Sequence, residues 1–271
     1  MNKKIRQWAR LCGKVGFISH GLIYITVALM AFHVFSGSGE RSTDFIGVLD
    51  ELVGSPTGKV YIFLLSVGFF GFALWRIVQV IWDTEENGKN VQGVAVRTLL
   101  GIIGVGYGWL GYNVFSLLLQ GGATSGDQTT EFTVARLMGS PLGLWLIGFA
   151  ASVVAAGSLY QFFQAVTARF KVTLRRERFK NRSWKIYILM GRIGLIARGV
   201  LFGVLSFLFF WALFTYDPQK AGSQGDVFSA LAEAPYGYWF IMAEALGLLI
   251  YGVFAAGQAR FRYLLMDEKG T

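Results

Sequence analysis

The sequence predicts an all-α membrane protein with six transmembrane helices. Of its 271 residues, 54% are apolar and only 15% are charged, whereas an ordinary soluble domain carries about 25% charged residues. Thirty-five glycines combined with only four prolines argue against a disordered or collagen-like chain. Six apolar stretches are each long enough to cross a bilayer, which takes about 20 mostly apolar residues per helix.

The apolar stretches cover residues 15–35, 58–82, 94–119, 142–168, 186–214 and 236–260. The first is longer than the roughly 7 to 15 apolar residues of a signal-peptide core, so we expect a retained span. The second, fourth and sixth each begin beside a proline, and the third and fifth follow polar connections. None shows the ten-residue alternation of barrel strands. Because backbone groups in lipid must pair within their own segment, we expect helices throughout.

Lysine and arginine gather in alternate connections between the apolar stretches. Most of the 25 lie before the first stretch, near the second and fourth connections, or after the sixth, while the opposite connections hold only Arg41, Lys59, Arg136 and Lys220. Basic residues near helix ends are retained in the cytoplasm. Both termini are therefore expected to be cytoplasmic, and the net charge of +9 is mainly a property of the inner face.

Three segments share the pattern L-x-x-x-P-x-G, beginning at Leu52, Leu137 and Leu231. Taking the prolines as the origin, a glycine lies 35 or 36 residues upstream and a glutamine 23 residues downstream in every copy. The chain is thus predicted to contain three copies of one two-helix unit. Its defining positions are Gly21, Gly106 and Gly199, Pro56, Pro141 and Pro235, Gly58, Gly143 and Gly237, and Gln79, Gln164 and Gln258.

The repeats suggest one membrane domain made of residues 1–88, 89–180 and 181–271. Because each copy contains two spans, all three enter the membrane from the same side, as parallel repeats about an axis along the membrane normal. We expect a six-helix bundle with pseudo-threefold symmetry, in which the second spans of the three repeats contact one another. Each proline should occupy the first turn of its helix, where its missing N–H costs no hydrogen bond.

Two segments carry a family resemblance. They are W-A-R-L-x-G-K-V-G-F-x-x-H-G-L-I-Y from Trp8 to Tyr24 and G-R-I-G-L-I-A-R-G-V-L-F from Gly191 to Phe202. Together with the three L-x-x-x-P-x-G segments, they resemble bacterial integral membrane proteins made of three copies of "domain of unknown function 1206". The resemblance covers nearly the whole chain, although the second repeat has no residue like Arg198. It implies a multi-pass protein of the bacterial cytoplasmic membrane and carries over no activity, substrate or catalytic residue.

Glu244 is the deepest ionisable residue in the predicted spans. It follows Pro235 by nine residues, or about 13.5 Å of helix, near the middle of a roughly 30 Å hydrocarbon core. Gly247, Tyr251, Ala255 and Gln258 share its helical face, so this face should point into the protein. An intramembrane acid is a functional-site candidate. Fixing the helix packing is the alternative, with the carboxyl group either protonated or paired with an arginine.

Arg198 occupies the repeat position that His20 holds in the first repeat and Val105 in the second. Both charged positions should lie about 9 Å inside the inner boundary. Arg198 could pair with Glu244 or extend toward the headgroups. With Arg76 and the three glutamines, His20 and Arg198 predict a polar, mostly cationic layer at the cytoplasmic mouth. This layer either binds an anionic solute or lipid headgroup, or joins helices by hydrogen bonds beside the usual basic rim.

Other chemistries find little support in the sequence. His20 and His33 are its only histidines, too few to ligate two haems within one chain. No zinc, hydrolase or phosphate-loop pattern occurs, so we expect neither a cofactor nor an enzyme. The linker at 169–185 carries eight basic residues and should lie on the anionic inner leaflet, where each cation contributes about 1 kcal/mol. No nucleic-acid-binding fold signature accompanies it.

Two functions remain for the whole chain. The first is a non-enzymatic helical membrane module that associates with lipids, which would be anionic at the inner leaflet, or with a membrane-protein partner or a second copy. The alternative is a channel or transporter for a small solute, ion or proton that uses Glu244 and the cationic layer. The two differ in what Glu244→Gln would do: the first expects an altered stability or association, and the second expects a lower flux.

Overall fold

A computed structural model describes residues 3–35, 49, 53–83, 88, 90–120, 134–217 and 235–263, and the side chains of residues 3–6, 9, 30 and 33–35 lie outside this description. Six long helices dominate these residues: α1 (Lys3–Phe35), α3 (Pro56–Trp82), α4 (Val91–Gln120), α6 (Pro141–Thr167), α7 (Asn181–Thr215) and α9 (Gly237–Phe261). All six are long and apolar enough to cross a membrane. The predicted all-α, multi-pass fold is confirmed.

The helix ends match the predicted stretches closely except at two N-termini. Helix α1 begins at Lys3 rather than at residue 15, and α7 begins at Asn181 rather than at residue 186. Hydropathy marks only the apolar part of a helix. Lysine and arginine are good helix formers, so these two helices continue through basic residues beyond the apolar stretch.

The proline motif starts two of the helices. Ser55 and Ser140 are N-caps whose side chains accept hydrogen bonds from the backbone N–H of Gly58 and Gly143, and the proline between each pair occupies the first turn. A Cβ at Gly143 would lie 1.8 Å from the Leu137 carbonyl oxygen, which explains the glycine. Of the three leucines that begin the motif, Leu137 is described, whereas Leu52 and Leu231 lie outside the described residues.

The third copy of the motif behaves differently. Pro235 lies in a turn before α9, which begins at Gly237, and the N-cap Tyr236 has a φ of +63° without a side-chain cap. The prediction that Pro235 occupies the first turn is therefore wrong. The physical reason is local: Ala234 replaces the serine and has no oxygen with which to cap the helix.

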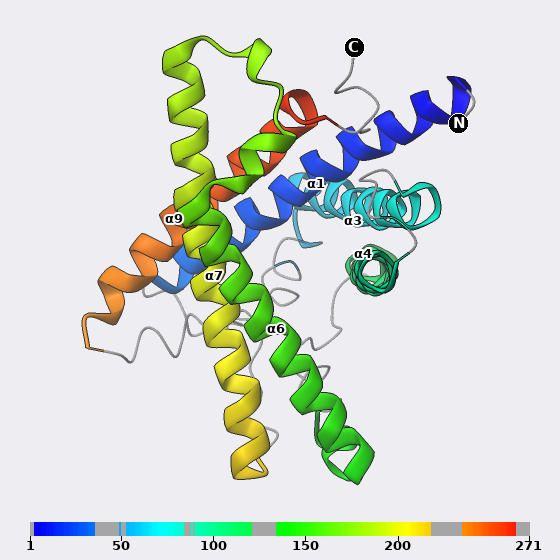
Figure 1. Ribbon diagram of the computed structural model, residues 1–271. Coiled ribbons are helices and arrows are strands. Elements are labelled where there is room, and N and C mark those ends of the chain that lie inside the picture. Colours follow the sequence, from blue (N-terminus) through cyan, green and yellow to red (C-terminus); the bar gives the residue numbers. More distant parts are fainter. Residues whose placement is uncertain are drawn as a thin grey trace.

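The six helices pack in an open row. Helix α4 packs on α3, α3 on α1, α1 on α9, α9 on α7 and α7 on α6. The residue pairs in contact show that each helix is antiparallel to its neighbour; for example, Gly21 meets Ala256 whereas Ile25 meets Gly252. Figure 1 shows the α1–α9 pair between two wings, α3–α4 and α6–α7. In that view α4 is seen almost along its axis whereas α7 lies across the picture.

This row corrects the predicted pseudo-threefold bundle. Among the described residues, the second helices α3, α6 and α9 do not pack extensively on one another, and the two helices of the second repeat lie at opposite ends of the row. The reason is visible at the repeat glycines. A Cβ at Gly21 would lie 2.5 Å from the Gly252 carbonyl oxygen, whereas a Cβ at Gly106 would meet nothing within 4 Å. Only the first of these glycines brings a helix of another repeat into backbone contact.

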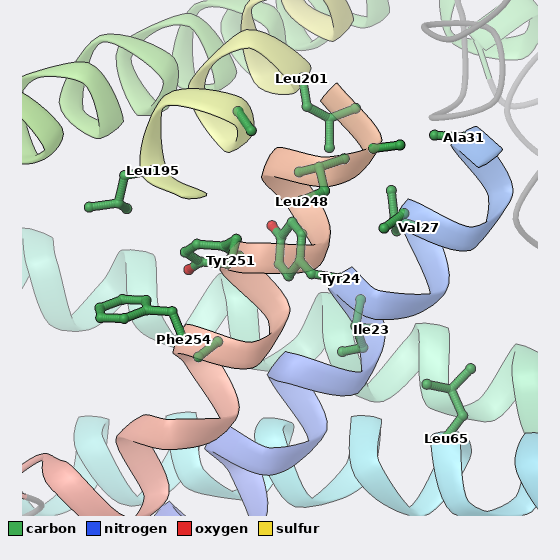
Figure 2. Close-up of a cluster of buried hydrophobic side chains, with 14 of the residues drawn as sticks. Ile23, Tyr24, Val27, Ala31, Leu65, Leu195, Leu201, Leu248, Tyr251 and Phe254 are labelled. Carbon is green, nitrogen blue, oxygen red and sulfur yellow. The ribbon is translucent and has the colours of Figure 1, made fainter. Parts of the chain in front are cut away.

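The main core lies where α1 and α9 meet and extends onto α3, α4 and α7. Tyr24 and Tyr251 are 3% and 4% exposed, and Val27 and Leu248 are fully buried. Figure 2 shows Tyr24 of α1 beside Tyr251 of α9 in the middle of this core. The interface between the first and last helices thus holds the polar residues described next.

Candidate functional site

The hydroxyl group of Tyr251 joins three helices at the centre of the protein. Arg198 of α7 donates a hydrogen bond from Nη1 to this oxygen at 2.7 Å, and Nε2 of His20 in α1 lies 3.4 Å from it. His20 and Arg198 are the repeat-equivalent residues that the sequence singled out. The structure brings them together through a tyrosine from the last helix.

Aromatic rings enclose the side chains of both His20 and Arg198. The His20 ring stacks on Phe72, with centroids 4.6 Å apart and planes 12° apart, and meets Tyr24 edge-on at 5.1 Å. The guanidinium carbon of Arg198 lies 4.9 to 5.2 Å from the ring centroids of Tyr24, Phe202 and Tyr251. Such cation–π contacts stabilise a buried guanidinium by about 1 to 2 kcal/mol each. We call His20, Tyr24, Phe72, Arg198 and Tyr251 the central cluster.

The central cluster contains no carboxylate. Within the described residues, no acidic side chain lies within ion-pair distance of Arg198 or His20, and the pairing of Arg198 with Glu244 is not formed. Seven residues, about 10 Å of helix, separate Glu244 from Tyr251 along α9. The Nε atom of Arg198 and the Nδ1 atom of His20 are buried without hydrogen-bond partners. The cluster therefore has buried donor groups and too few acceptors.

The central cluster lies midway along the helices that carry His20 and Arg198. Arg198 is the middle residue of α7 (Asn181–Thr215), and His20 lies at the middle of the apolar span Arg10–Leu29 of α1. The predicted 9 Å counts six residues from the boundary cations Lys14 and Arg192 to His20 and Arg198. Their distance from the inner boundary of the membrane stays a prediction.

The repeat-equivalent glutamines fall into two kinds. Gln79 and Gln258 are buried, and their Oε1 atoms accept hydrogen bonds from Arg76 and Arg262 at 2.8 and 2.9 Å. Gln164 instead donates to the Tyr160 hydroxyl at 2.6 Å.

Two arginines complete the polar layer around the first two glutamines. The Arg76 guanidinium lies 4.7 Å from the centroid of Phe72, the ring on which His20 stacks. Arg262 was not among the predicted site residues. Its position four residues after Gln258 was the available signal, because residues at i and i+4 share a helix face.

Glu244 is buried at 6% exposure on the inward face of α9. Its carboxyl group faces the backbone of Leu201 in α7, and Oε1 has no hydrogen-bond partner. The other residues assigned to this face are buried as well, which confirms the predicted orientation: Gly247, Tyr251, Ala255 and Gln258. Glu244 and the central cluster are two separate polar features.

The second repeat contributes little to the centre. Val105, which occupies the position of His20 and Arg198, is 73% exposed. The neighbouring Tyr107 approaches the cluster, with its ring 4.6 Å from Phe72 and 6.1 Å from His20. The central cluster is thus built mainly from the first and third repeats.

A second candidate site lies where α7 begins. Lys171, Trp184, Lys185, Ile188, Leu189 and Arg192 line a pocket of about 340 Å³ between the 3-10 helix η1 (Arg169–Thr173) and α7. We call it the basic pocket. The basic linker predicted at 169–185 contributes Lys171, Trp184 and Lys185 to this pocket, and Arg192 of α7 adds a third cation.

The linker beside the basic pocket is anchored to the end of α9. Leu174 and Arg262 form an isolated antiparallel bridge, and the Arg175 N–H donates to the Phe261 carbonyl at 2.7 Å. The ring of Phe179 packs on Phe261 and Trp184, with centroids 4.3 and 5.4 Å apart. These contacts hold the linker beside the pocket against the end of α9.

His33, the other histidine considered for haem ligation, has a side chain outside the described residues.

Comparison with known proteins bears on the repeats and on the whole chain. A family model described as "Domain of Unknown Function (DUF1206)" matches three times, at residues 15–83, 99–168 and 193–262. A protein of Bacillus subtilis (strain 168), printed as "Uncharacterized protein YxxB", is 24% identical over 269 residues, covering 99% of this chain and 96% of that protein. No solved structure matches the chain.

Proposed function

Because the chain belongs to the DUF1206 family, whose description assigns no activity, we propose its function from its own residues: a non-enzymatic module of the bacterial cytoplasmic membrane that associates with anionic lipid. Both termini are cytoplasmic in this proposal. The observation that carries it is the basic pocket, which is lined by three cations and three apolar side chains. A membrane-protein partner or a second copy remains a prediction from the sequence.

The depth of the basic pocket suits a lipid headgroup. Helix α7 has 35 residues and is therefore about 52 Å long, which exceeds a hydrocarbon core of about 30 Å. Its first twelve residues, which include Trp184, Lys185 and Arg192, then lie in the interfacial region in this proposal. Tryptophan is favoured there because one end of its ring system is apolar and its N–H is polar.

The lining of the pocket matches an amphipathic ligand. Lys171, Lys185 and Arg192 offer positive charge to a phosphate group, while Leu189 is 55% exposed and continues the apolar surface along α7. Arg192 already donates to the Val166 carbonyl at 2.9 Å, which holds its guanidinium near α6. An anionic phospholipid would place its phosphate between the cations and its chains along the helix.

Lipid binding by a charge-deleted variant tests this proposal. The purified protein is titrated with phosphatidylglycerol in neutral detergent, and the bound lipid is counted by native mass spectrometry, with phosphatidylcholine as the reference lipid. K171Q/K185Q should bind phosphatidylglycerol about 30-fold more weakly, since each cation contributes about 1 kcal/mol.

The matched control removes the same charge elsewhere. Lys59 and Arg136 are exposed and precede or begin the second helices of their repeats, at the opposite ends from the basic pocket. K59Q/R136Q should keep the wild-type affinity. Equal weakening in both double variants, or no preference of the wild type for phosphatidylglycerol, would refute a specific pocket.

Conduction of a small solute, ion or proton is the second candidate function. The buried Glu244 with its unpartnered Oε1 favours it, because acids inside membrane helices often lie on ion or proton paths. Such conduction would be passive, ion-coupled or driven by a partner. Flux through vesicles that contain E244Q separates it from the first candidate.

A further inference from the structure

The central cluster holds a permanent charge that the described residues do not balance. The guanidinium of Arg198 does not lose its proton in proteins. Its recorded polar partners are the tyrosine hydroxyls of Tyr251 and Tyr24, which are neutral groups. Cation–π contacts with three rings offset part of the cost of burying this charge, but they supply no negative charge. A negative charge next to Arg198 would remove this imbalance.

The hydrogen-bond pattern also calls for an acceptor. Because Tyr251 accepts from Arg198 at 2.7 Å, its own O–H is free to donate to Nε2 of His20. That arrangement places the proton of a neutral His20 on Nδ1, an atom buried without a partner, as is Nε of Arg198. Two buried N–H groups on neighbouring side chains thus lack an acceptor, and neither can be satisfied by a cation.

Arg198 is the most exposed polar residue of the central cluster. His20 is 6% exposed and Tyr251 is 4% exposed, whereas the Arg198 side chain is only partly buried. The rings of Tyr24, Phe202 and Tyr251 surround its guanidinium carbon and hold the side chain in place. Because these rings are apolar, a charge-assisted hydrogen bond to the Arg198 guanidinium is stronger than it would be in water.

From these observations we infer that the central cluster is a binding site for a monovalent anion, which contacts Arg198 from its exposed side and takes His20 as a second donor. One arginine beside a neutral histidine balances a single negative charge. A halide or a carboxylate group has the required charge and acceptor capacity. The carboxylate can come from water, as acetate does, or from a membrane-dissolved fatty acid.

Direct binding measurements test the anion site. The purified full-length protein in neutral detergent is equilibrated with radiolabelled chloride or acetate, and binding is measured with increasing unlabelled chloride, acetate or laurate as competitor. We expect a single saturable class of sites. Competition by laurate at far lower concentration than acetate would assign the site to a membrane carboxylate, and equal potency would assign it to a free anion.

Three variants locate the site. R198Q should weaken anion binding at least about tenfold, because it removes the charge and most of the donors. R198K, which keeps the charge but loses the planar set of donors, should give an intermediate affinity. R182Q removes an exposed charge from the same helix and should bind as the wild type does.

Anion binding to the wild-type protein tests the inference even if R198Q does not fold. Absence of saturable binding of chloride and acetate to the wild type overturns it. Equal weakening in R198Q and R182Q overturns it as well, because the effect would then follow the net charge rather than the central cluster.

Discussion

At the scale of single residues, Tyr251 and Glu244 are buried polar residues on the same face of α9 that differ in their hydrogen bonds. The Tyr251 hydroxyl has Arg198 at 2.7 Å and His20 at 3.4 Å. Glu244 lies two turns away on the same inward face and has an oxygen without a partner. The first residue joins three helices, and the second is the chain's buried acid among the described residues.

The substitution E244Q separates the two candidate functions. In the membrane-module proposal, the ion and proton permeability of reconstituted vesicles stays at the wild-type level. The thermal unfolding midpoint should not fall, because the amide has nearly the same volume and carries no charge to desolvate. Vesicle flux with a pH-sensitive dye measures the first quantity, and unfolding in detergent measures the second.

The control for E244Q is E177Q, which changes an exposed carboxylate that accepts a hydrogen bond from Tyr263. A flux that falls in E244Q but not in E177Q, while both proteins remain folded, would contradict the membrane-module proposal and favour conduction.

Residue patterns in the sequence were enough to select His20 and Arg198, because the repeat aligned them and both are ionisable. They could not show that Tyr251 connects the two, since this contact joins residues 231 positions apart. The pairing of Arg262 with Gln258 was local and could have been found.

At the scale of helices, close backbone contact between α1 and α9 organises the row. A Cβ at Gly252 would lie 2.8 Å from the Gly21 carbonyl oxygen, and the converse distance is 2.5 Å. Small residues allow membrane helices to approach in this way, so that dispersion forces and weak hydrogen bonds stabilise the pair. The same glycine position is open in the second repeat.

Two alanine substitutions at equivalent repeat positions test this difference. G21A should lower the free energy of unfolding by about 1 to 3 kcal/mol, because the added methyl group overlaps the α9 backbone. G106A should leave it unchanged or raise it by up to about 1 kcal/mol, because alanine favours helix more than glycine does. Unfolding in mixed detergent measures both, and equal destabilisation of the two variants would refute the α1–α9 contact.

Helices and their order were predictable, but their packing partners were not. Apolar length predicted all six helices, and proline predicted the N-termini of α3 and α6. The repeat glycines are equivalent in sequence, however, and which of them meets another backbone depends on the tertiary arrangement. That is why a symmetric bundle was expected and an open row, α4–α3–α1–α9–α7–α6, was found.

At the scale of the whole molecule, the alternation of antiparallel neighbours agrees with repeats that all enter the membrane in the same sense. Along the row, first and second helices of the repeats alternate, and the contacting residues of each neighbouring pair run in opposite order. This arrangement gathers the basic linker, the end of α9 and the basic pocket at one end of their helices. It places the helix starts after Pro56, Pro141 and Pro235 at the other.

Cysteine accessibility in intact bacterial cells tests the shared sense of insertion most directly. In a C12A background, single cysteines replace exposed residues at the starts of the second helices (K59C, L142C, Y238C) or near the starts of the first helices (L11C, V91C, R182C). A membrane-impermeant maleimide should label the first set in intact cells and the second set only after permeabilisation. Labelling that divides either set between the two sides of the membrane would contradict three hairpin repeats inserted in the same sense.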